Sequence, residues 1–271
     1  YTDPDDFSER IARNQQLLLL EESHLGKVAD PGAGSYYIEN LTKLIAEAAW
    51  KLFVEIEDEG GFLEAVKKGT IQKNVSSAAQ SRRSDVARRK EVLLGTNQYP
   101  NFTELSGKKF DTARAFSHRE TPADAIIEII EPARAGIEFE TLRYATEHSG
   151  HTPVVFMLTM GNLAMRRARS QFACNFFACA GYRVVDNNGF ETAQEGVKAA
   201  LDAGADIIVI CSSDDEYAAF APEAFRATAG RALFVVAGAP ACSDELKKEG
   251  IEHFISVKSD VLETLKMFSD K

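Results

Sequence analysis

The sequence has 271 residues, of which 45% are hydrophobic, and it carries a formal net charge of −10 at pH 7. This length and composition are typical of one or two packed domains and exclude a disordered chain. Both halves are acidic, which disfavours nucleic-acid binding because that kind of interface needs clustered Lys and Arg. No apolar run is long enough to cross a bilayer, so we expect no membrane partner.

The cysteines and the first residue bear on the cellular compartment. No pair of cysteines has C-x-x-C spacing, which predicts reduced core side chains and not a metal site. No secretory signal is recognised in the sequence, and we expect a cytoplasmic protein. Because the chain opens at Tyr1 inside the lead-in to a helix, we also expect further residues upstream. The cysteines are Cys174, Cys179, Cys211 and Cys242.

Residues 1–99 have the pattern of helices separated by turns. The spacing of apolar residues and the flanking acids, Gly and Pro mark the boundaries. The predicted elements are helices at 5–22, 41–56, 62–67 and 75–90 and a brief strand at 92–94. These cannot close a barrel, since a complete (β/α)8 barrel takes about 250 residues. We therefore predict a mainly helical closing fragment of such a barrel, with apolar stripes left exposed or covered by a neighbouring molecule.

Residues 100–151 form a predicted linker that contains helices. The first part is polar and aperiodic, which is typical of a segment that wraps a surface. The Thr-Pro-Ala-Asp run that begins at Thr121 combines an N-cap, an N1 proline and an acidic N3, and so predicts a helix start. Pro132 and Gly136 interrupt the helical spacing, which resumes over 139–148.

Residues 152–271 alternate short apolar runs with helical stretches. The near-continuous hydrophobicity of runs such as Ile207-Ile208-Val209-Ile210 predicts burial on both faces of a sheet. Alternating strands and helices with short connections predict an α/β domain, with a doubly wound five-stranded parallel sheet of order 2-1-3-4-5. The predicted strands lie at 154–158, 183–185, 206–210, 233–237 and 253–257.

Two stretches near the N-terminus have a specific resemblance. The run from Arg13-Asn14-Gln15-Gln16 to Leu25, and the Asp-Pro-Gly-Ala-Gly-Ser-Tyr-Tyr run at 30–37, resemble the late barrel segment of methylmalonyl-CoA mutases. Joined to a linker and a flavodoxin-like domain, the resemblance covers nearly the whole chain. It implies that 152–271 is similar to a cobalamin-binding domain. Catalytic chains of this family use adenosylcobalamin to interconvert methylmalonyl-CoA and succinyl-CoA, and heterodimeric members add a smaller homologue that binds no cofactor.

The cobalamin-binding motif of the family is altered in this sequence. In cobalamin-binding relatives, Asp-x-His-x-x-Gly occupies the turn after the first strand. The His binds cobalt, the Asp holds its tautomer, and the Gly lets the nucleotide tail lie against backbone. The matching positions are Leu163, Met165 and Ala168, and none of these side chains can do this chemistry. Where the family has Ser-x-Leu and Gly-Gly after the third and fourth strands, this chain has Cys211-Ser212-Ser213 and Gly238-Ala239.

The resemblance thus implies the small, non-cobalamin-binding subunit of a heterodimeric mutase. This chain would then contribute no catalytic or metal-binding residue and bind no cofactor, adenosylcobalamin would lie in the large catalytic partner subunit, and the role would be to stabilise that partner. Two other functions stay open. One is a mutase chain that binds cobalamin without His ligation; the other is an independent small-molecule-binding module at the carboxyl ends of the strands. Co-purification with a large chain, a red cofactor or another ligand would separate them.

Charged residues near these positions allow a functional and a structural interpretation. Arg166, Arg167 and Arg169 crowd the predicted helix start, where they could bind an anion. We favour surface cations paired with Asp or Glu. The acidic run 214–216 could hold a hard cation, but helix capping through the macrodipole explains it better.

Histidines supply the remaining candidates. His24 lies beside Glu21 and Glu22, a possible acid/base group, although a hydrogen-bonded histidine on a barrel helix is favoured because no nucleophile accompanies it. His148 and His151 lie in a connection and are expected to be exposed loop residues, since metal binding needs further ligands.

Overall fold

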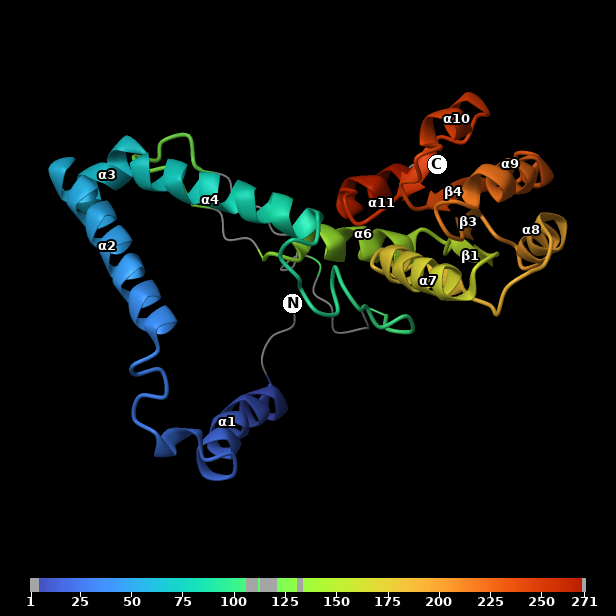
Figure 1. Cartoon of the computed structure of the whole chain (residues 1–271). Coiled ribbons are helices and arrows are strands. Elements are labelled where there is room, and N and C mark those ends of the chain that lie inside the picture. Colours follow the sequence, from blue (N-terminus) through green and yellow to red (C-terminus); the bar gives the residue numbers. More distant parts are fainter. Residues whose placement is uncertain (1–4, 106–111, 113–120, 131–133, 270–271) are drawn as a thin grey trace. The chain divides into compact units, whose positions relative to one another are not determined.

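The computed structural model describes residues 5–105, 112, 121–130 and 134–269 (Figure 1). The chain divides into two compact units, one made of 1–78 with 109–132 and the other of 79–108 with 133–271. Helix α4 (Thr70–Ala87) contributes residues to both, because the boundary falls after residue 78.

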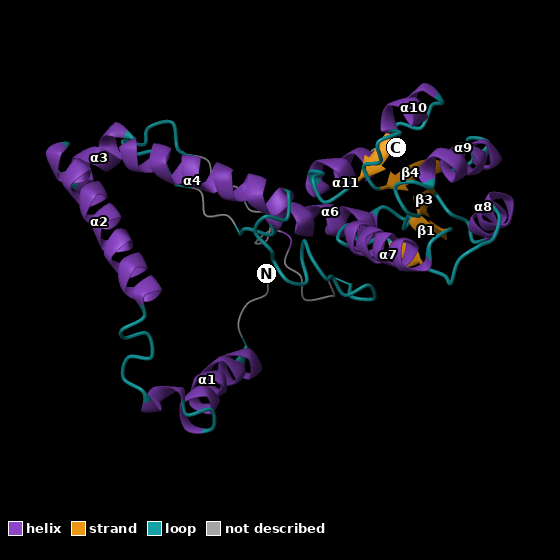
Figure 2. Cartoon of the chain, viewed as in Figure 1, coloured by secondary structure: helices purple, strands orange, loops and turns teal. Residues whose placement is uncertain are grey.

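The first unit is built from helices, drawn in purple in Figure 2. A capping box begins it: Asp5 accepts a hydrogen bond from Ser8 N at 2.8 Å, and Ser8 Oγ accepts one from Asp5 N at 2.9 Å. Gly60 and Gly61 follow the long helix α2 with φ of 104° and 90°, a conformation that glycine adopts without strain. The elements are α1 (Asp6–Glu21), η1 (Leu25–Lys27), α2 (Tyr36–Asp58), α3 (Phe62–Lys68) and the first part of α4.

The apolar stripes of the first two long helices are uncovered. Within the described residues neither α1 nor α2 contains a buried residue. Leu20 is 53% exposed and Trp50 is 67% exposed. The predicted helices with exposed stripes are therefore confirmed, and their place at the end of a barrel stays a prediction. No helix in the described part is both long enough and apolar enough to span a membrane.

The strand predicted at 92–94 is wrong. This stretch forms a tight turn instead, in which the only pairing is an isolated bridge between Leu94 and Gln98. Gly95 has a φ of 82°, and Leu93 N donates to the side chain of Asn97 at 2.8 Å. The backbone N–H of Leu93 therefore donates to a side chain and not to a neighbouring strand, so no β-ladder forms here.

The helix predicted to start at Thr121 is also wrong. Residues 121–130 form turns. The hydroxyl of Thr121 accepts a hydrogen bond from Ile129 N at 3.1 Å, eight residues away, and so does not cap a helix. Ala125 N donates to Pro122 O at 3.0 Å, which closes a single turn. The break predicted at Pro132 lies outside the described residues.

The second unit contains a five-stranded sheet of order β2-β1-β3-β4-β5, and every pair is parallel. The predicted order is thus confirmed, and predicted boundaries are within two residues of the observed ones. The last strand ends early, at Ile255, because Ser256 N donates to Ser259 Oγ at 2.9 Å and starts a turn. The strands are β1 (Val154–Thr159), β2 (Arg183–Val185), β3 (Ile207–Cys211), β4 (Leu233–Ala237) and β5 (His253–Ile255).

Both faces of this sheet are covered, as the apolar strands predict. Alternate residues point to opposite faces, so Met157 joins a core cluster with Phe177 while Leu158 joins a second cluster with Val197. Helices α6, α7 and α11 and the end of α4 supply the helical residues of the first cluster, and α8, α9 and α10 supply those of the second. The helices are α6 (Ile137–His148), α7 (Leu163–Ala178), α8 (Ala193–Asp202), α9 (Tyr217–Thr228), α10 (Ser243–Lys248) and α11 (Val261–Ser269).

Candidate functional site at the carboxyl edge of the sheet

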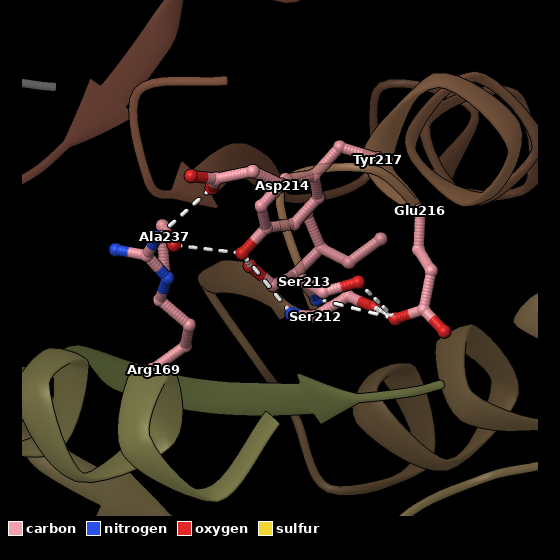
Figure 3. A network of polar contacts seen from close by, with 8 residues as sticks. Arg169, Ser212, Ser213, Asp214, Glu216, Tyr217 and Ala237 are labelled. Atoms are coloured by element: carbon pink, nitrogen blue, oxygen red, sulfur yellow. Dashed lines mark hydrogen bonds and ion pairs between the residues drawn. The ribbon is translucent and has the colours of Figure 1, made fainter. Parts of the chain in front are cut away.

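The carboxyl ends of β1, β3 and β4 lead into three loops that meet at one edge of the sheet. Ligands of doubly wound folds bind at this edge, so it is the place to test for a site. The loops contain Gly161-Asn162, Ser212 to Glu216 and Gly238-Ala239. Figure 3 shows the polar contacts within the second of these loops, and from it and Tyr217 to Arg169 of α7 and to Ala237 at the end of β4.

The carboxylate of Glu216 is the acceptor at the centre of these contacts. It accepts hydrogen bonds from Ser212 Oγ at 2.6 Å and from Ser213 Oγ at 2.7 Å, which are drawn in Figure 3. Backbone amides add to these: Ser213 N lies 3.2 Å from Oε2, and Asn162 N lies 3.1 Å from each oxygen. The hydroxyls of Ser212 and then Ser213 contribute most to lowering the pKa of Glu216 to about 2. Glu216 is therefore a charged brace between the β1–α7 and β3–α9 loops.

The backbone at Gly161 is shaped to admit this carboxylate. Gly161 has a φ of +69°, and a Cβ built on it would lie 2.3 Å from Glu216 Oε2. Real Cβ atoms do not approach that closely, so any side chain here would displace the carboxylate. Glycine at 161 and glutamate at 216 thus fit one another.

Tyr217 ties the same edge to the fourth strand. Its ring is fully buried, and its hydroxyl donates to Ala237 O at 2.7 Å and accepts from Ser212 N at 3.0 Å (Figure 3). Burial raises the pKa of this phenol well above its usual value, so the hydroxyl stays protonated. It serves as a structural hydrogen-bonding group between the β3–α9 loop and the end of β4.

Two of the three arginines are held by the chain itself. Arg169 donates to Asp214 Oδ1 at 2.9 Å, as the favoured pairing with an acid predicts. Arg166 donates instead to backbone oxygens, Gly161 O at 3.2 Å and Asn188 O at 2.8 Å, so pairing with a carboxylate is wrong for this residue. Its guanidinium lies against Gly189, where a Cβ would come within 2.6 Å of Arg166 Cζ. Arg167 is exposed.

The three positions of the altered motif lie on α7 and not in the turn where they were expected. The turn is short because Asn162 caps the helix at once: its Oδ1 accepts from Ala164 N and Met165 N, each at 3.1 Å. Leu163 is therefore the first helical residue and is 55% exposed, Met165 is 39% exposed, and Ala168 is exposed as well.

The other altered positions belong to the loops and strand ends of this edge. Cys211 is fully buried, and burial raises the pKa of its thiol well above the usual value, which makes it an inert core residue. Ser213 hydrogen-bonds Glu216, as above. Gly238 is buried, and a Cβ there would lie 3.1 Å from both Asp214 Oδ1 and a ring carbon of Tyr217; Ala239 is exposed.

The prediction that the acidic run 214–216 caps a helix is wrong for the side chains. The run lies before α9, which begins at Tyr217, and among the described residues no side chain caps this helix. Asp214 pairs with Arg169, and Glu216 braces the loops. The sequence does carry a signal for this brace, since Ser213-x-x-Glu216 has capping-box spacing and Glu216 reaches back to Ser213 N. The partner Asn162, 54 residues away, could not be found that way.

None of the three histidines proposed as candidates from the sequence is among the residues of this edge. His24 is exposed and has a left-handed backbone with φ of 55°. His148 is exposed, with Nδ1 2.9 Å from Tyr144 O, and His151 Nε2 lies 3.0 Å from Asp206 Oδ2 at the opposite end of the strands. Over the described residues there is no group of three His, Cys, Asp or Glu that could hold a metal ion.

The brace predicts a pH dependence of stability. The folded pKa of Glu216, about 2, lies below its usual value of 4.5, so its contribution is complete above about pH 5 and is lost as pH falls toward 2. Glu216→Gln should cost about 1–2 kcal/mol at pH 7, allowing for solvent screening, and the difference from the unmodified chain should shrink below pH 5. Urea unfolding from pH 7 to 3 measures it. Glu223→Gln is the control, since Glu223 is exposed on α9, the helix that follows Glu216. A constant difference between Glu216→Gln and the unmodified chain across this pH range would contradict the assignment.

The fold and this edge define a doubly wound α/β domain of the flavodoxin-like class. Comparison with known proteins shows which family the chain resembles over its whole length. The sequence pattern of the methylmalonyl-CoA mutase family matches residues 1–129. A methylmalonyl-CoA mutase small subunit from Porphyromonas gingivalis is 59% identical over the full chain, which spans 44% of that relative. The small subunit from Propionibacterium freudenreichii subsp. shermanii is 32% identical over 85% of the chain and 35% of its own length.

A relative called simply methylmalonyl-CoA mutase, from Rhizobium meliloti, is 49% identical over 35% of this chain. The two small subunits, in contrast, match most or all of the chain. This chain therefore belongs to the methylmalonyl-CoA mutase family, and its similarity is to the small subunits. It spans less than half the length of these curated relatives.

Proposed function

We propose that this chain is part of the non-catalytic small subunit of a heterodimeric, adenosylcobalamin-dependent methylmalonyl-CoA mutase. The partner large subunit interconverts methylmalonyl-CoA and succinyl-CoA, and this chain stabilises it without contributing a catalytic residue. The single observation that carries the proposal is the edge of the sheet, where the chain's own side chains occupy the place of a ligand. The four free cysteines agree with a reducing, cytoplasmic location.

The residues at this edge do not fit cobalamin. No histidine side chain lies there among the described residues. The side chains of Leu163 and Met165 contain no nitrogen or oxygen atom that could bind cobalt. Asn162 starts α7 directly, which leaves no extended loop for a nucleotide tail. Arg166 lies against Gly189, the Glu216 carboxylate lies against Gly161, and Asp214 and Tyr217 lie against Gly238, so side chains cover the bare backbone at all three glycines.

The two alternatives fare less well on the same observations. A cobalamin site without His ligation would still have to house the nucleotide tail, and Arg166 and Glu216 stand in its way. An independent ligand-binding module would need an open crevice with free polar groups, whereas Arg169 of α7 pairs with Asp214 and the Glu216 carboxylate accepts from Asn162 N. The Nε of Arg169, which has no hydrogen-bond partner among the described residues, is buried. Neither alternative explains the similarity to small subunits along the whole chain.

The proposal predicts that the subunit does not bind cobalamin. Titration of the purified full-length subunit with adenosylcobalamin or hydroxocobalamin, followed by absorbance and calorimetry, should show no saturable binding in the micromolar range, equivalent to about −8 kcal/mol. Co-expression with the large subunit should give a stable complex in which the cofactor is bound once. A tight stoichiometric complex with the isolated small subunit would overturn the proposal.

A variant with the motif restored sharpens this test. The combination Leu163→Asp, Met165→His and Ala168→Gly returns the ligand set but leaves Arg166 and Glu216 in place. We expect weak binding at most and no mutase activity, because opening the crevice also requires removing packed contacts, at about 2–5 kcal/mol for each large-to-small change. Binding as tight as that of a catalytic chain would show that the crevice is already open.

A further inference from the structure

Four donors from two loops converge on one carboxylate at the carboxyl edge of the sheet. Two are backbone amides, of Asn162 and Ser213, and two are hydroxyls, of Ser212 and Ser213. The loops belong to β1–α7 and β3–α9, so the donors are brought together only by the sheet. All four donors contact Oε2, and Asn162 N also contacts Oε1. Hydrogen bonds to an ionised acceptor are the strong ones, so a set of this kind suits a carboxylate.

The carboxylate that occupies this set is partly open to solvent. Glu216 is only partly buried, and the space beside Gly161 exists because that residue has no Cβ. A side chain shortened at position 216 would therefore leave donors lining a space that a small molecule can enter from water. The two serine hydroxyls and the two amides would be left without their acceptor, which favours refilling.

The charges around the set select among anions. Arg166 donates to backbone oxygens, and the charge of Arg169 is balanced by the Asp214 carboxylate; the Nε of Arg169 is buried and has no hydrogen-bond partner among the described residues. Asp214 and Asp215 precede Glu216 in the same loop and disfavour a dianion. A small monocarboxylate fits this environment better than a phosphate.

We propose that Asn162, Ser212 and Ser213 form a carboxylate-binding site whose ligand is the chain's own Glu216, and that this residue closes the crevice to other anions. When the Glu216 carboxylate is removed, the site takes a small monocarboxylate from solution. This inference deepens the proposed function, on which it rests for the meaning of the closed crevice.

The test is chemical rescue of Glu216→Ala in the full-length subunit. Its thermal unfolding temperature should fall below that of the unmodified protein, and acetate or formate should restore part of the loss. The restoration should saturate with a Kd on the order of 10 mM, as expected for a ligand of three or four non-hydrogen atoms. Sodium chloride at matched ionic strength and phosphate should not restore it. The unmodified protein and Glu223→Ala should respond to acetate only as they respond to chloride.

Equal shifts by acetate in all three proteins would overturn the site, and phosphate acting as well as acetate would overturn its selectivity. If Glu216→Ala does not fold, Glu216→Gln is used instead, because glutamine has nearly the same size and shape as glutamate. Amide hydrogen exchange is then the measurement. The amides of Asn162 and Ser213 should exchange faster than in the unmodified protein, and unchanged exchange would contradict the proposal. Rescue by acetate together with tight cobalamin binding would contradict the proposed function and support the carboxylate-binding site. No rescue and no cobalamin binding would contradict the site and support the proposed function.

Discussion

Replacing Tyr217 with phenylalanine is expected to lower the free energy of unfolding of the sheet-containing unit by about 2–3 kcal/mol. The hydroxyl donates to Ala237 O and accepts from Ser212 N, and both Tyr217 and Ser212 are fully buried. Phenylalanine keeps the ring but leaves a buried N–H and a buried carbonyl without this partner. Tyr217→Ala should cost about 3–5 kcal/mol for the lost ring as well. Urea unfolding followed by circular dichroism measures both.

Tyr182→Phe is the matched control for this prediction. The hydroxyl of Tyr182 lies 2.7 Å from Ser269 Oγ, and Ser269 is exposed, so water can replace the lost partner. The cost should stay below about 1 kcal/mol. If Tyr182→Phe cost as much as Tyr217→Phe, the buried hydrogen bonds at the carboxyl edge would not be the cause.

Replacing Asn97 with alanine is expected to be as damaging, at about 2–4 kcal/mol. Asn97 has no exposed surface, and its side chain satisfies three backbone groups. Its Oδ1 accepts from Leu93 N at 2.8 Å, and its Nδ2 donates to Val86 O at 2.8 Å and to Glu91 O at 2.9 Å. Alanine would leave these groups unpaired in a buried turn. The same urea experiment measures the loss.

Asn101→Ala is the control for Asn97. Its Oδ1 accepts from Thr103 N at 3.1 Å in an exposed turn, so water can take its place and the change should stay within about 0.5 kcal/mol. Asn97→Asp tests the donors separately, since it keeps the acceptor but places a negative charge against two carbonyl oxygens. It should be at least as destabilising as alanine. Equal stability of Asn97→Ala and Asn101→Ala would mean that the turn is held by other contacts.

The turn around Asn97 also shows where sequence patterns are insufficient. Three apolar residues at 92–94 suggest a strand, but the turn is set by Asn97 and by Arg89, which donates to Asn97 O at 2.5 Å and to Asn175 O at 3.2 Å. The helix signal at Thr121 fails for a similar reason, because its hydroxyl is used by Ile129 N. A local motif predicts an element only when no other group along the chain takes its hydrogen-bonding groups, as Asn97 does for Leu93 N and Ile129 N does for the Thr121 hydroxyl.

The sequence by itself determined the parallel sheet, its order and the helices on both faces. Strands that are apolar throughout can be stable only when both faces are covered, and short right-handed connections then leave few possible orders. It also determined the family, through runs near the N-terminus, and showed that Leu163, Met165 and Ala168 lack ligand chemistry. These properties are fixed by local spacing and by the chemistry of single side chains.

Only the tertiary structure decided how the edge of the sheet is closed. Glu216 meets Asn162 across 54 positions of sequence, and Tyr217 meets Ala237 across 20, so neither contact follows from local spacing. The early start of α7, in contrast, is a local effect, because the Asn162 side chain caps the helix through amides two and three residues further along the chain. Hydrogen bonds between loops form because the sheet brings strand ends together, and that proximity exists only in the folded chain.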